Sequence, residues 1–375
     1  MHGDKENKPI ILIASGLKPI RDSRAFEKLG LSLRETNKYS LNFIGFSLKS
    51  PLNQEGIRFF SSINDTKSLL KRILMPLRFL YTLLKIRPQL VICCTWEYLP
   101  IAKLLKPILN FKLIYDVQEN YIANLNLNPN LSTWRKQLAK SLIKKAERSK
   151  GIDYYLLAEA VYKKEMPLKK PYLILENKFR GNAQNKNLSI PIKKKNAGFQ
   201  FVLGGTITPA FGSEEAIEWF KVIQSNYTDS VLILIGHVPL RAYLSYLREI
   251  ASDNPNIIFT LSEDPIPHSE LLAAYEKADF ILMPYQQKDE IKSKMPTKIY
   301  EAAALKRPLL FSPNPKWKKF IYAYQGGFEI DFKKLSGASE TFQQALIKDY
   351  FISDVPVEIY WESQQDDFLN LIDSL

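Results

Sequence analysis

Several polar and charged side chains in this sequence follow short apolar runs, which is where an open α/β sheet presents the residues that bind ligands. The most distinctive is Glu301, a carboxylate inside the apolar helical stretch that ends at Leu305. A carboxylate surrounded by apolar residues needs a polar partner. Glu301 could accept hydrogen bonds from the hydroxyl groups of a ligand, pair with Lys298 three residues earlier, or face solvent.

The segment around Glu301 has the pattern of a parallel crossover unit. It follows the apolar run Phe280–Met283 and leads into Leu309–Phe311, and its helix is expected to begin at Pro296, because proline is favoured at the first helical position. Open α/β sheets bind ligands at the edge where such a strand-to-helix loop lies. The other residues of this segment that we place in a candidate binding site are Lys294, Pro296, Thr297 and Lys298.

A second candidate segment is Gly204-Gly205-Thr206, which is expected in a loop between the strand 199–203 and the next helix. Such a loop could cradle a phosphate at a helix N-terminus, or its glycines could serve a turn that needs positive φ. His237 follows another apolar run and is expected at the same edge. The sequence has no Gly-x-Gly-x-x-Gly at a strand end and no Gly-Lys-Ser/Thr, which argues against a dinucleotide oxidoreductase and a P-loop NTPase.

The first half of the chain has its own polar residues after an apolar run. Gly16 follows the run Ile10–Ala14 at a predicted tight turn, and Arg21, Asp22 and Arg24 come next. The two arginines could hold an anionic or hydroxylated substrate. Alternatively, this stretch is a solvated helix start in which Asp22 is the N-cap.

Two further carboxylates follow the apolar run Phe111–Tyr115. Asp116 and Glu119 are expected near the carboxyl edge of the sheet, where either could act as a general base or could belong to a capped turn. His268 precedes a helix and is predicted to cap it locally. Since no histidine has a metal-ligand spacing, we expect no metal site.

Apolar runs and helical patterns alternate along the chain, as in doubly wound α/β domains. At 375 residues the chain is long enough for two such domains. We expect an N-terminal domain at 1–180, a polar linker at 181–198, a C-terminal domain at 199–355 and a final helix at 356–375. Two domains imply a cleft between them, which is a preferred place for a ligand.

Composition indicates a globular protein, with 46% hydrophobic and 12% aromatic residues. The adjacent Cys93 and Cys94 are predicted to be buried thiols in a reducing compartment. The apolar run that begins at Ile10 is too short for a signal peptide, and no stretch approaches the ~20 apolar residues of a membrane span. We therefore expect a cytoplasmic protein.

Charge differs between the two halves. Residues 1–195 carry 36 Lys+Arg against 15 Asp+Glu, a net charge of +21, whereas residues 196–375 carry 16 against 24, a net charge of −8. Two basic amphipathic stretches, 67–87 and 134–150, could lie on anionic lipid, or could simply be helices packed on a sheet with solvated lysines. Nucleic acid is not expected, because aromatic residues are not interleaved with the charge.

Together these stretches resemble the GT-B glycosyltransferases, specifically the large, mostly retaining family (group 1, or family 4, type) that makes bacterial cell-surface glycans. The two most specific stretches are 271–284, similar to the family's pattern of a helix, Ala-Asp, an apolar strand and Pro, and 296–308, similar to its Pro-x-Lys-x-x-Glu-Ala pattern. The other matching stretches are 21–27, 115–120, 173–177 and 204–206. The resemblance extends over nearly the whole chain.

This resemblance implies two Rossmann-like domains facing a central cleft, with the C-terminal helix crossing back to the first domain. It implies that the C-terminal domain binds a UDP- or GDP-linked sugar, with Glu301 at the ribose, Gly205 and Thr206 near the diphosphate, and Lys298 beside it. No other cofactor is implied. The residues assigned to the acceptor side are Gly16, Arg21, Asp22 and Arg24, and those assigned to chemistry are Asp116, Gln118 and Glu119.

The sequence also departs from the family pattern at charged positions. Gln118 replaces a common histidine, Thr206 and Phe211 stand where the glycine-rich loop usually has Arg and Lys, and Ser293 replaces an acid. A departing diphosphate needs positive charge or oriented N–H groups. The remaining candidates for this role are the helix N-termini and two side chains, Lys294 and Lys298.

Three functions follow as hypotheses. The first is a glycosyltransferase of polysaccharide biosynthesis that acts on a cell-surface glycan or lipid-linked acceptor, with peripheral contact to the inner face of the cytoplasmic membrane through its basic half. The second is a catalytically degenerate GT-B protein that binds nucleotide or glycan as a partner subunit, in line with the departures at charged positions. The third is a nucleotide-sugar epimerase on the same fold.

Overall fold

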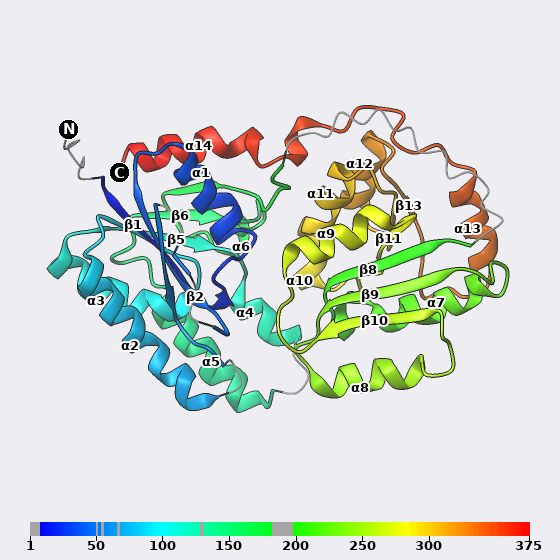
Figure 1. The fold of residues 1–375 in the computed structure, drawn as a ribbon, viewed down its shortest axis with the longest axis horizontal. Helices are drawn as coiled ribbons and strands as arrows, with labels where there is room; N and C mark the ends of the chain where they lie inside the picture. The colour runs from blue at the N-terminus through cyan, green and yellow to red at the C-terminus, as the bar shows by residue number, and fades with distance from the viewer. Residues whose placement is uncertain (1–7, 50–51, 54–55, 66–67, 128–130, 182–197) are drawn as a thin grey trace. The chain divides into compact units, whose positions relative to one another are not determined.

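The protein is described by a computed structural model that covers residues 8–49, 52–53, 56–65, 68–127, 131–181 and 198–375. The chain divides into two compact units: unit 1 is Met1–Arg180 with Gln364–Leu375, and unit 2 is Gly181–Ser363. Each unit is a parallel sheet flanked by helices (Figure 1). Of the expected linker 181–198, residues 182–197 lie outside the described residues.

Unit 1 has a seven-stranded parallel sheet in the order β3-β2-β1-β4-β5-β6-β7. The strands are β1 (Ile10–Pro19), β2 (Ser40–Phe46), β3 (Ile57–Ser61), β4 (Leu90–Cys93), β5 (Lys112–Val117), β6 (Tyr154–Leu157) and β7 (Tyr172–Ile174). The strand order reverses between β1 and β4. Every residue of β4 is buried, which is the environment that a continuous apolar run predicts for a strand covered on both faces.

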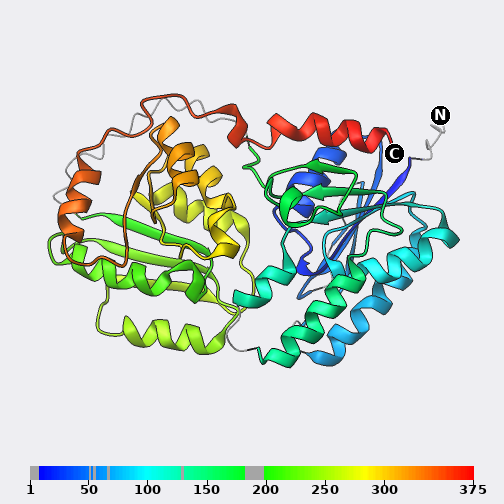
Figure 2. The same cartoon turned by 180° about the vertical axis from the view of Figure 1, so that it is seen from behind.

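The helices of unit 1 form a layer on each face of this sheet. They are η1, a π-helix (Ala25–Gly30), α1 (Leu31–Glu35), α2 (Leu69–Ile86), η2 (Trp96–Tyr98), α3 (Leu99–Leu109), α4 (Tyr121–Asn124), η3 (Leu125–Leu127), α5 (Thr133–Ala146), α6 (Tyr162–Glu165) and α14 (Glu362–Asp373). Figures 1 and 2 show α2, α3 and α5 side by side on one face, and α1 and α14 on the other. Met75, Phe79 and Leu83 of α2 enter the core beneath the sheet.

Helix α14 returns to unit 1 after the chain has passed through unit 2, as the GT-B resemblance implies. The Gln364 side chain accepts a hydrogen bond from the Glu176 N–H (3.1 Å) and donates one to the Glu176 carbonyl (2.5 Å). Phe368 and Ile372 are buried on the same helix. The apolar stripe of α14 therefore packs on unit 1, and the paired amide bonds fix its first turn.

Unit 2 repeats the architecture with a six-stranded parallel sheet in the order β10-β9-β8-β11-β12-β13. Its strands are β8 (Gln200–Thr206), β9 (Val231–His237), β10 (Ile257–Ser262), β11 (Phe280–Met283), β12 (Leu309–Phe311) and β13 (Gly327–Glu329). Its helices are η4 (Pro209–Phe211), α7 (Ser213–Gln224), α8 (Arg241–Ile250), α9 (His268–Lys277), α10 (Asp289–Lys292), α11 (Thr297–Ala304), α12 (Pro315–Ala323), α13 (Ala338–Leu346) and η5 (Val357–Ile359). The strand order reverses between β8 and β11, so this is the point where ligands bind in open α/β sheets.

The structure corrects two expectations about local structure. The expected loop Gly204-Gly205-Thr206 is the end of strand β8, where it pairs with Ile235–His237 of β9. Strand β3 was not expected, because its sequence, Ile57–Ser61, contains Arg58 and is followed by polar residues. Cys93 and Cys94 are buried free thiols, as predicted. Among the described residues, no helix is long and apolar enough to cross a membrane.

Candidate functional site

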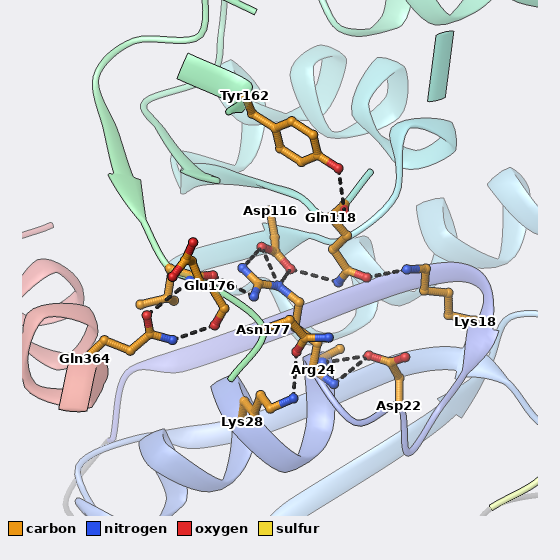
Figure 3. A network of polar contacts seen from close by, with 12 residues as sticks. Lys18, Asp22, Arg24, Lys28, Asp116, Gln118, Tyr162, Glu176, Asn177 and Gln364 are labelled. Atoms are coloured by element: carbon orange, nitrogen blue, oxygen red, sulfur yellow. Dashed lines mark hydrogen bonds and ion pairs between the residues drawn. The ribbon is translucent and has the colours of Figure 1, made fainter. Parts of the chain in front are cut away.

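A buried ion pair joins two of the residues that the sequence singled out in unit 1. The Arg24 Nε lies 3.0 Å from both carboxylate oxygens of Asp116, and its Nη2 lies 2.7 Å from Asp116 Oδ1 (Figure 3). Arg24 is 2% exposed and Asp116 is 0% exposed. Burial acts against the charge of Arg24, but the neighbouring Asp116 carboxylate outweighs it and raises the arginine pKa.

Other groups of the protein form the remaining hydrogen bonds of this ion pair. The Arg24 Nη1 donates to the Leu175 carbonyl (2.7 Å), and the Gln118 amide donates to Asp116 Oδ2 (2.8 Å). Both oxygens of Asp116 are thus occupied, so the arrangement does not support a role for Asp116 as a general base. In the same way, the guanidinium of Arg24 is held by the protein and not presented to a ligand.

Gln118 connects the buried pair to a more accessible cation. The Lys18 ammonium donates to Gln118 Oε1 (2.5 Å; Figure 3). It also lies 3.2 Å from Glu119 Oε1. Burial acts to lower the pKa of Lys18, but the neighbouring carboxylates, Glu119 foremost, raise it overall. Glu119 is 41% exposed in its side chain, whereas Asp116 is fully buried. The sequence did not indicate Lys18 as a site residue, because it lies within strand β1 and not in a loop after it.

The remaining acceptor-side candidates have separate surroundings. Asp22 Oδ1 accepts hydrogen bonds from the backbone N–H groups of Arg24 and Ala25 (2.9 Å each), so it stabilises the turn that leads into η1, although Arg24 and not Asp22 stands at the N-cap of that helix. Arg21 is exposed, with its guanidinium 5.4 Å from the centre of the Phe59 ring. The Gly16 N–H donates to Thr95 Oγ1 (3.0 Å), which links the ends of β1 and β4. Of these candidates, Arg24 alone pairs with Asp116 through its side chain.

In unit 2, Glu301 is buried with 7% exposure on helix α11, so the solvent-facing alternative is wrong. Its Oε1 lies 2.9 Å from Nε2 of His268, the first residue of α9. No hydrogen bond of its second oxygen is found among the described residues. The expected local capping role of His268 is also wrong, because α9 has Pro267 at its N-cap and no side-chain cap.

Lys298 lies one turn before Glu301 and is also buried. Its ammonium donates to the Leu282 carbonyl at the end of β11 (3.0 Å) and lies 5.0 Å from the centre of the Tyr285 ring. Burial lowers the pKa of Lys298 to about 7, although the Glu301 charge acts in the opposite direction. The structure describes no ion pair between these two side chains, so the second alternative for Glu301 is not realised as a direct contact.

The glycine segment lies close to helix α9, which carries His268. A Cβ on Gly204 would lie 2.2 Å from Leu271 and 2.8 Å from the Tyr275 hydroxyl of α9, so any larger residue would displace these side chains. Gly205 has φ +102°, a conformation that favours glycine. Gly204 therefore lets β8 and α9 approach at the edge where the strand order reverses.

The remaining predicted residues of unit 2 surround this edge. His237 ends β9 beside Thr206, and its burial lowers its pKa. Pro296 is the N-cap of α11 and Thr297 is its first residue. The Lys294 carbonyl accepts a hydrogen bond from the Trp317 indole (2.8 Å).

Phe211, which stands where the family pattern usually has a cation, belongs to an aromatic stack. Phe211 lies against Tyr285 with a ring-centre distance of 4.6 Å. Tyr285 in turn carries Lys298 over its ring. The buried lysine and this stack therefore form one cluster, which the sequence reveals only as a departure at Phe211.

The two units thus offer different chemistry. The switch point of unit 2 gathers a carboxylate that can accept hydrogen bonds from hydroxyl groups, a buried amine and the free N–H groups of a helix start, which suits a hydroxylated and anionic ligand. Unit 1 offers Glu119 and Lys18 near a sealed ion pair. Among the described residues, no group of three or more His, Cys, Asp or Glu is placed to hold a metal ion.

Comparison with known proteins agrees with this architecture. The chain is 25% identical over 256 residues to the putative teichuronic acid biosynthesis glycosyltransferase TuaH of Bacillus subtilis, a match that covers 64% of this chain and 62% of TuaH. No family model matches the sequence.

Solved structures resemble almost the entire chain. Sucrose-phosphate synthase from Thermosynechococcus elongatus superposes with a TM-score of 0.66 at 13% identity, covering 98% of this chain and 99% of that one. HepE of Anabaena, in complex with UDP and glucose, gives a TM-score of 0.63 at 12% identity, covering 98% and 100%. The chain therefore has the GT-B fold, and the predicted resemblance to GT-B glycosyltransferases is confirmed at the level of the fold.

Proposed function

We propose that this protein is a glycosyltransferase that moves a sugar from a UDP- or GDP-linked donor to a cell-surface glycan or lipid-linked acceptor at the cytoplasmic face of the membrane. The observation that carries the proposal is the buried Glu301 carboxylate, held by His268 on one oxygen at the switch point of unit 2. The similarity to TuaH, a putative glycosyltransferase of teichuronic acid biosynthesis, supports the acceptor class. The complex of HepE with UDP supports the donor class.

In this proposal the second oxygen of Glu301 accepts hydrogen bonds from the ribose hydroxyls. The bond to His268 restricts rotation of the carboxylate, so the oxygen is oriented before the donor arrives. Gly205, Thr206 and the start of α11 provide N–H groups and space for the diphosphate. Gly204, His237, Lys294 and Lys298 complete the donor side, with Pro296 and Thr297 setting the start of α11.

On the acceptor side we retain Gly16, Arg21 and Asp22, and we assign chemistry to Glu119 with Gln118. Asp116 and Arg24 become positioning residues, since Asp116 holds the Gln118 amide at 2.8 Å. No cofactor other than the donor substrate takes part in the proposal.

Thermal shift with UDP, GDP and their sugars tests the donor assignment. Glu301→Gln keeps the size of the side chain but removes its charge, so nucleotide affinity should fall by about 10- to 100-fold, equivalent to losing a charged hydrogen bond of about 1.5–3 kcal/mol. The matched control is Glu276→Gln, an exposed carboxylate on α9, which should bind as the unaltered protein does. No shift with any of these nucleotides would contradict the proposal.

Turnover separates the alternatives. A transferase should release UDP or GDP faster when membrane or glycan extract is added as acceptor. Nucleotide binding without sugar transfer or donor hydrolysis would instead indicate a non-catalytic GT-B partner subunit. Release of free nucleotide without any acceptor would point to the epimerase.

A further inference from the structure

Large apolar side chains are concentrated on the solvent side of three helices of unit 1. Of the 21 exposed large hydrophobic residues found among the described residues, 11 lie on α2, α3 and α5. These are Leu70, Ile73, Leu74, Leu77, Tyr81, Leu84, Leu104, Ile108, Trp134, Leu138 and Leu142. Single exposed apolar residues are ordinary, but a concentration on adjacent elements marks an interaction surface.

Helix α2 is apolar on two opposite sides. Its inner side places Met75, Phe79 and Leu83 in the core. Its outer side exposes a second stripe, in which Ile73, Leu77 and Leu84 are spaced by four and seven residues. A helix that is apolar around most of its circumference is stable between two apolar environments, of which the sheet provides only one.

Helix α5 has the same property in a shorter form. Trp134, Leu138 and Leu142 are four residues apart, so they form one exposed stripe along the outer side. Ile143 and Ala146 face inward and are buried. The stripe continues the pattern of α2 on a helix that lies on the same face of the sheet (Figures 1 and 2).

The charge on these helices has a single sign. Together α2, α3 and α5 contain 11 lysines and arginines and no aspartate or glutamate. Arg72, Lys85, Arg135, Lys144 and Lys145 are among the exposed ones. The surface is therefore both apolar and cationic, and a partner must complement both properties.

Charge complementarity selects the partner. A second copy of the chain would bring cations against cations across a symmetric interface. Nucleic acid would match the charge but not the exposed leucines. An anionic bilayer matches both, since leucines and tryptophan enter the boundary of the acyl chains while lysines and arginines reach the phosphates.

We propose that the outer face of α2, α3 and α5, the apolar–basic face, docks on an anionic lipid bilayer. The proposal goes beyond the sugar-transfer reaction and does not depend on it, because it rests only on the exposed residues of these helices. It assigns the general expectation of membrane contact to defined side chains.

Vesicle flotation of the full-length protein tests this face. We expect binding to phosphatidylcholine vesicles with about 30% phosphatidylglycerol, and binding at least about tenfold weaker to phosphatidylcholine alone, because each cation near an anionic surface contributes about 1 kcal/mol. High salt should reduce the binding, since it screens exposed charge. Equal binding to both kinds of vesicle, or to neither, would overturn the proposal.

Two sets of substitutions separate the apolar and the cationic contributions. Leu77→Gln with Leu138→Gln, and Lys144→Glu with Lys145→Glu, should each weaken flotation by about tenfold or more. All four residues are exposed, so the thermal unfolding midpoint should stay close to that of the unaltered protein. The apolar control, Ile347→Gln in unit 2, is 80% exposed and should bind vesicles normally.

Trp134 supplies a spectroscopic readout. It is 64% exposed, whereas Trp96 is partly buried and Trp219, Trp317 and Trp361 are fully buried. Its emission should shift to the blue on addition of anionic vesicles, and Trp134→Phe should remove the shift while the protein still floats. A shift that persists undiminished in Trp134→Phe, or concentration-dependent dimers that Leu77→Gln and Leu138→Gln abolish without any vesicle binding, would overturn the proposal.

Discussion

Unit 1 and unit 2 bury charged side chains at the carboxyl edges of their sheets in opposite ways. In unit 1, Arg24 and Asp116 neutralise one another through several short hydrogen bonds. In unit 2, Lys298 and Glu301 lie one turn apart without a described ion pair, the lysine on a carbonyl and the glutamate on a histidine. In unit 1, both oxygens of the Asp116 carboxylate form hydrogen bonds within the protein. In unit 2, one oxygen of Glu301 bonds to His268, and the other can accept hydrogen bonds from a ligand.

The pKa values express the same difference. Pairing with Asp116 raises the pKa of Arg24 despite its burial, but burial lowers the pKa of Lys298 to about 7. Removing one member of a buried ion pair is strongly destabilising, because the other charge is then left buried and unpaired. A buried charge with an incomplete partner costs stability, and such costs are concentrated at binding sites.

The largest effect is expected from breaking the sealed pair. Arg24→Met should lower the free energy of unfolding by about 3–5 kcal/mol, because it leaves the Asp116 charge buried and unpaired. Denaturant unfolding followed by circular dichroism measures the loss. Arg24→Met combined with Asp116→Leu removes both charges and should recover much of it; a single variant as stable as the parent would show that the pair does not hold unit 1 together.

An intermediate effect concerns Lys298 and its dependence on pH. Its folded pKa of about 7 lies below the ordinary value near 10.4, so between these pH values the unfolded chain binds the proton that the folded chain has released. The cost of burying the charge is complete below pH 7 and disappears as the pH rises toward 10.

Lys298→Met should therefore stabilise the protein most at pH 6 and progressively less up to pH 10. Thermal unfolding midpoints over this pH range measure the difference between the variant and the parent. Lys292→Met, at an exposed lysine of α10, should show no such trend. A pH-independent difference for Lys298→Met would mean that the lysine is ordinarily charged in the folded protein.

The smallest effect is expected at His268. His268→Asn shortens the side chain and removes the bond that orients Glu301, so nucleotide affinity should fall by about five- to tenfold, equivalent to about 1 kcal/mol. Calorimetric titration with UDP or GDP measures the change. If His268→Asn weakened binding as much as Glu301→Gln, the histidine would contact the nucleotide itself and would be more than a positioning residue.

Much of the fold was predictable from the sequence, because apolar runs such as Leu90–Cys93 have one stable placement, a strand covered on both faces. The end of β8 was not. Gly204-Gly205-Thr206 looks like a loop locally, yet it continues the strand because Gly236 on β9 allows close approach: a Cβ there would lie 1.8 Å from the Gly205 carbonyl oxygen. Compatibility between two strands is not visible in either one alone.

The candidate site shows the same limit. Glu301 was recognisable because its apolar neighbours imply burial, but its partner His268 lies 33 residues earlier on another helix. The Arg24–Asp116 pair spans 92 residues, and only the tertiary fold reveals that two residues predicted for binding and catalysis satisfy one another. A local sequence pattern identifies a charged residue that must be buried. Which residue forms a hydrogen bond with it depends on the tertiary fold.

The return of α14 to unit 1 has a consequence for synthesis on the ribosome. The nascent N-terminal sheet lacks Phe368, Ile372 and the Gln364 amide until all of unit 2 has been translated, a delay of about 10–40 s at ordinary elongation rates. During that interval the strip of surface beneath α14 is open to chaperones. Unit 1 is therefore begun first but is completed only after unit 2 has been translated.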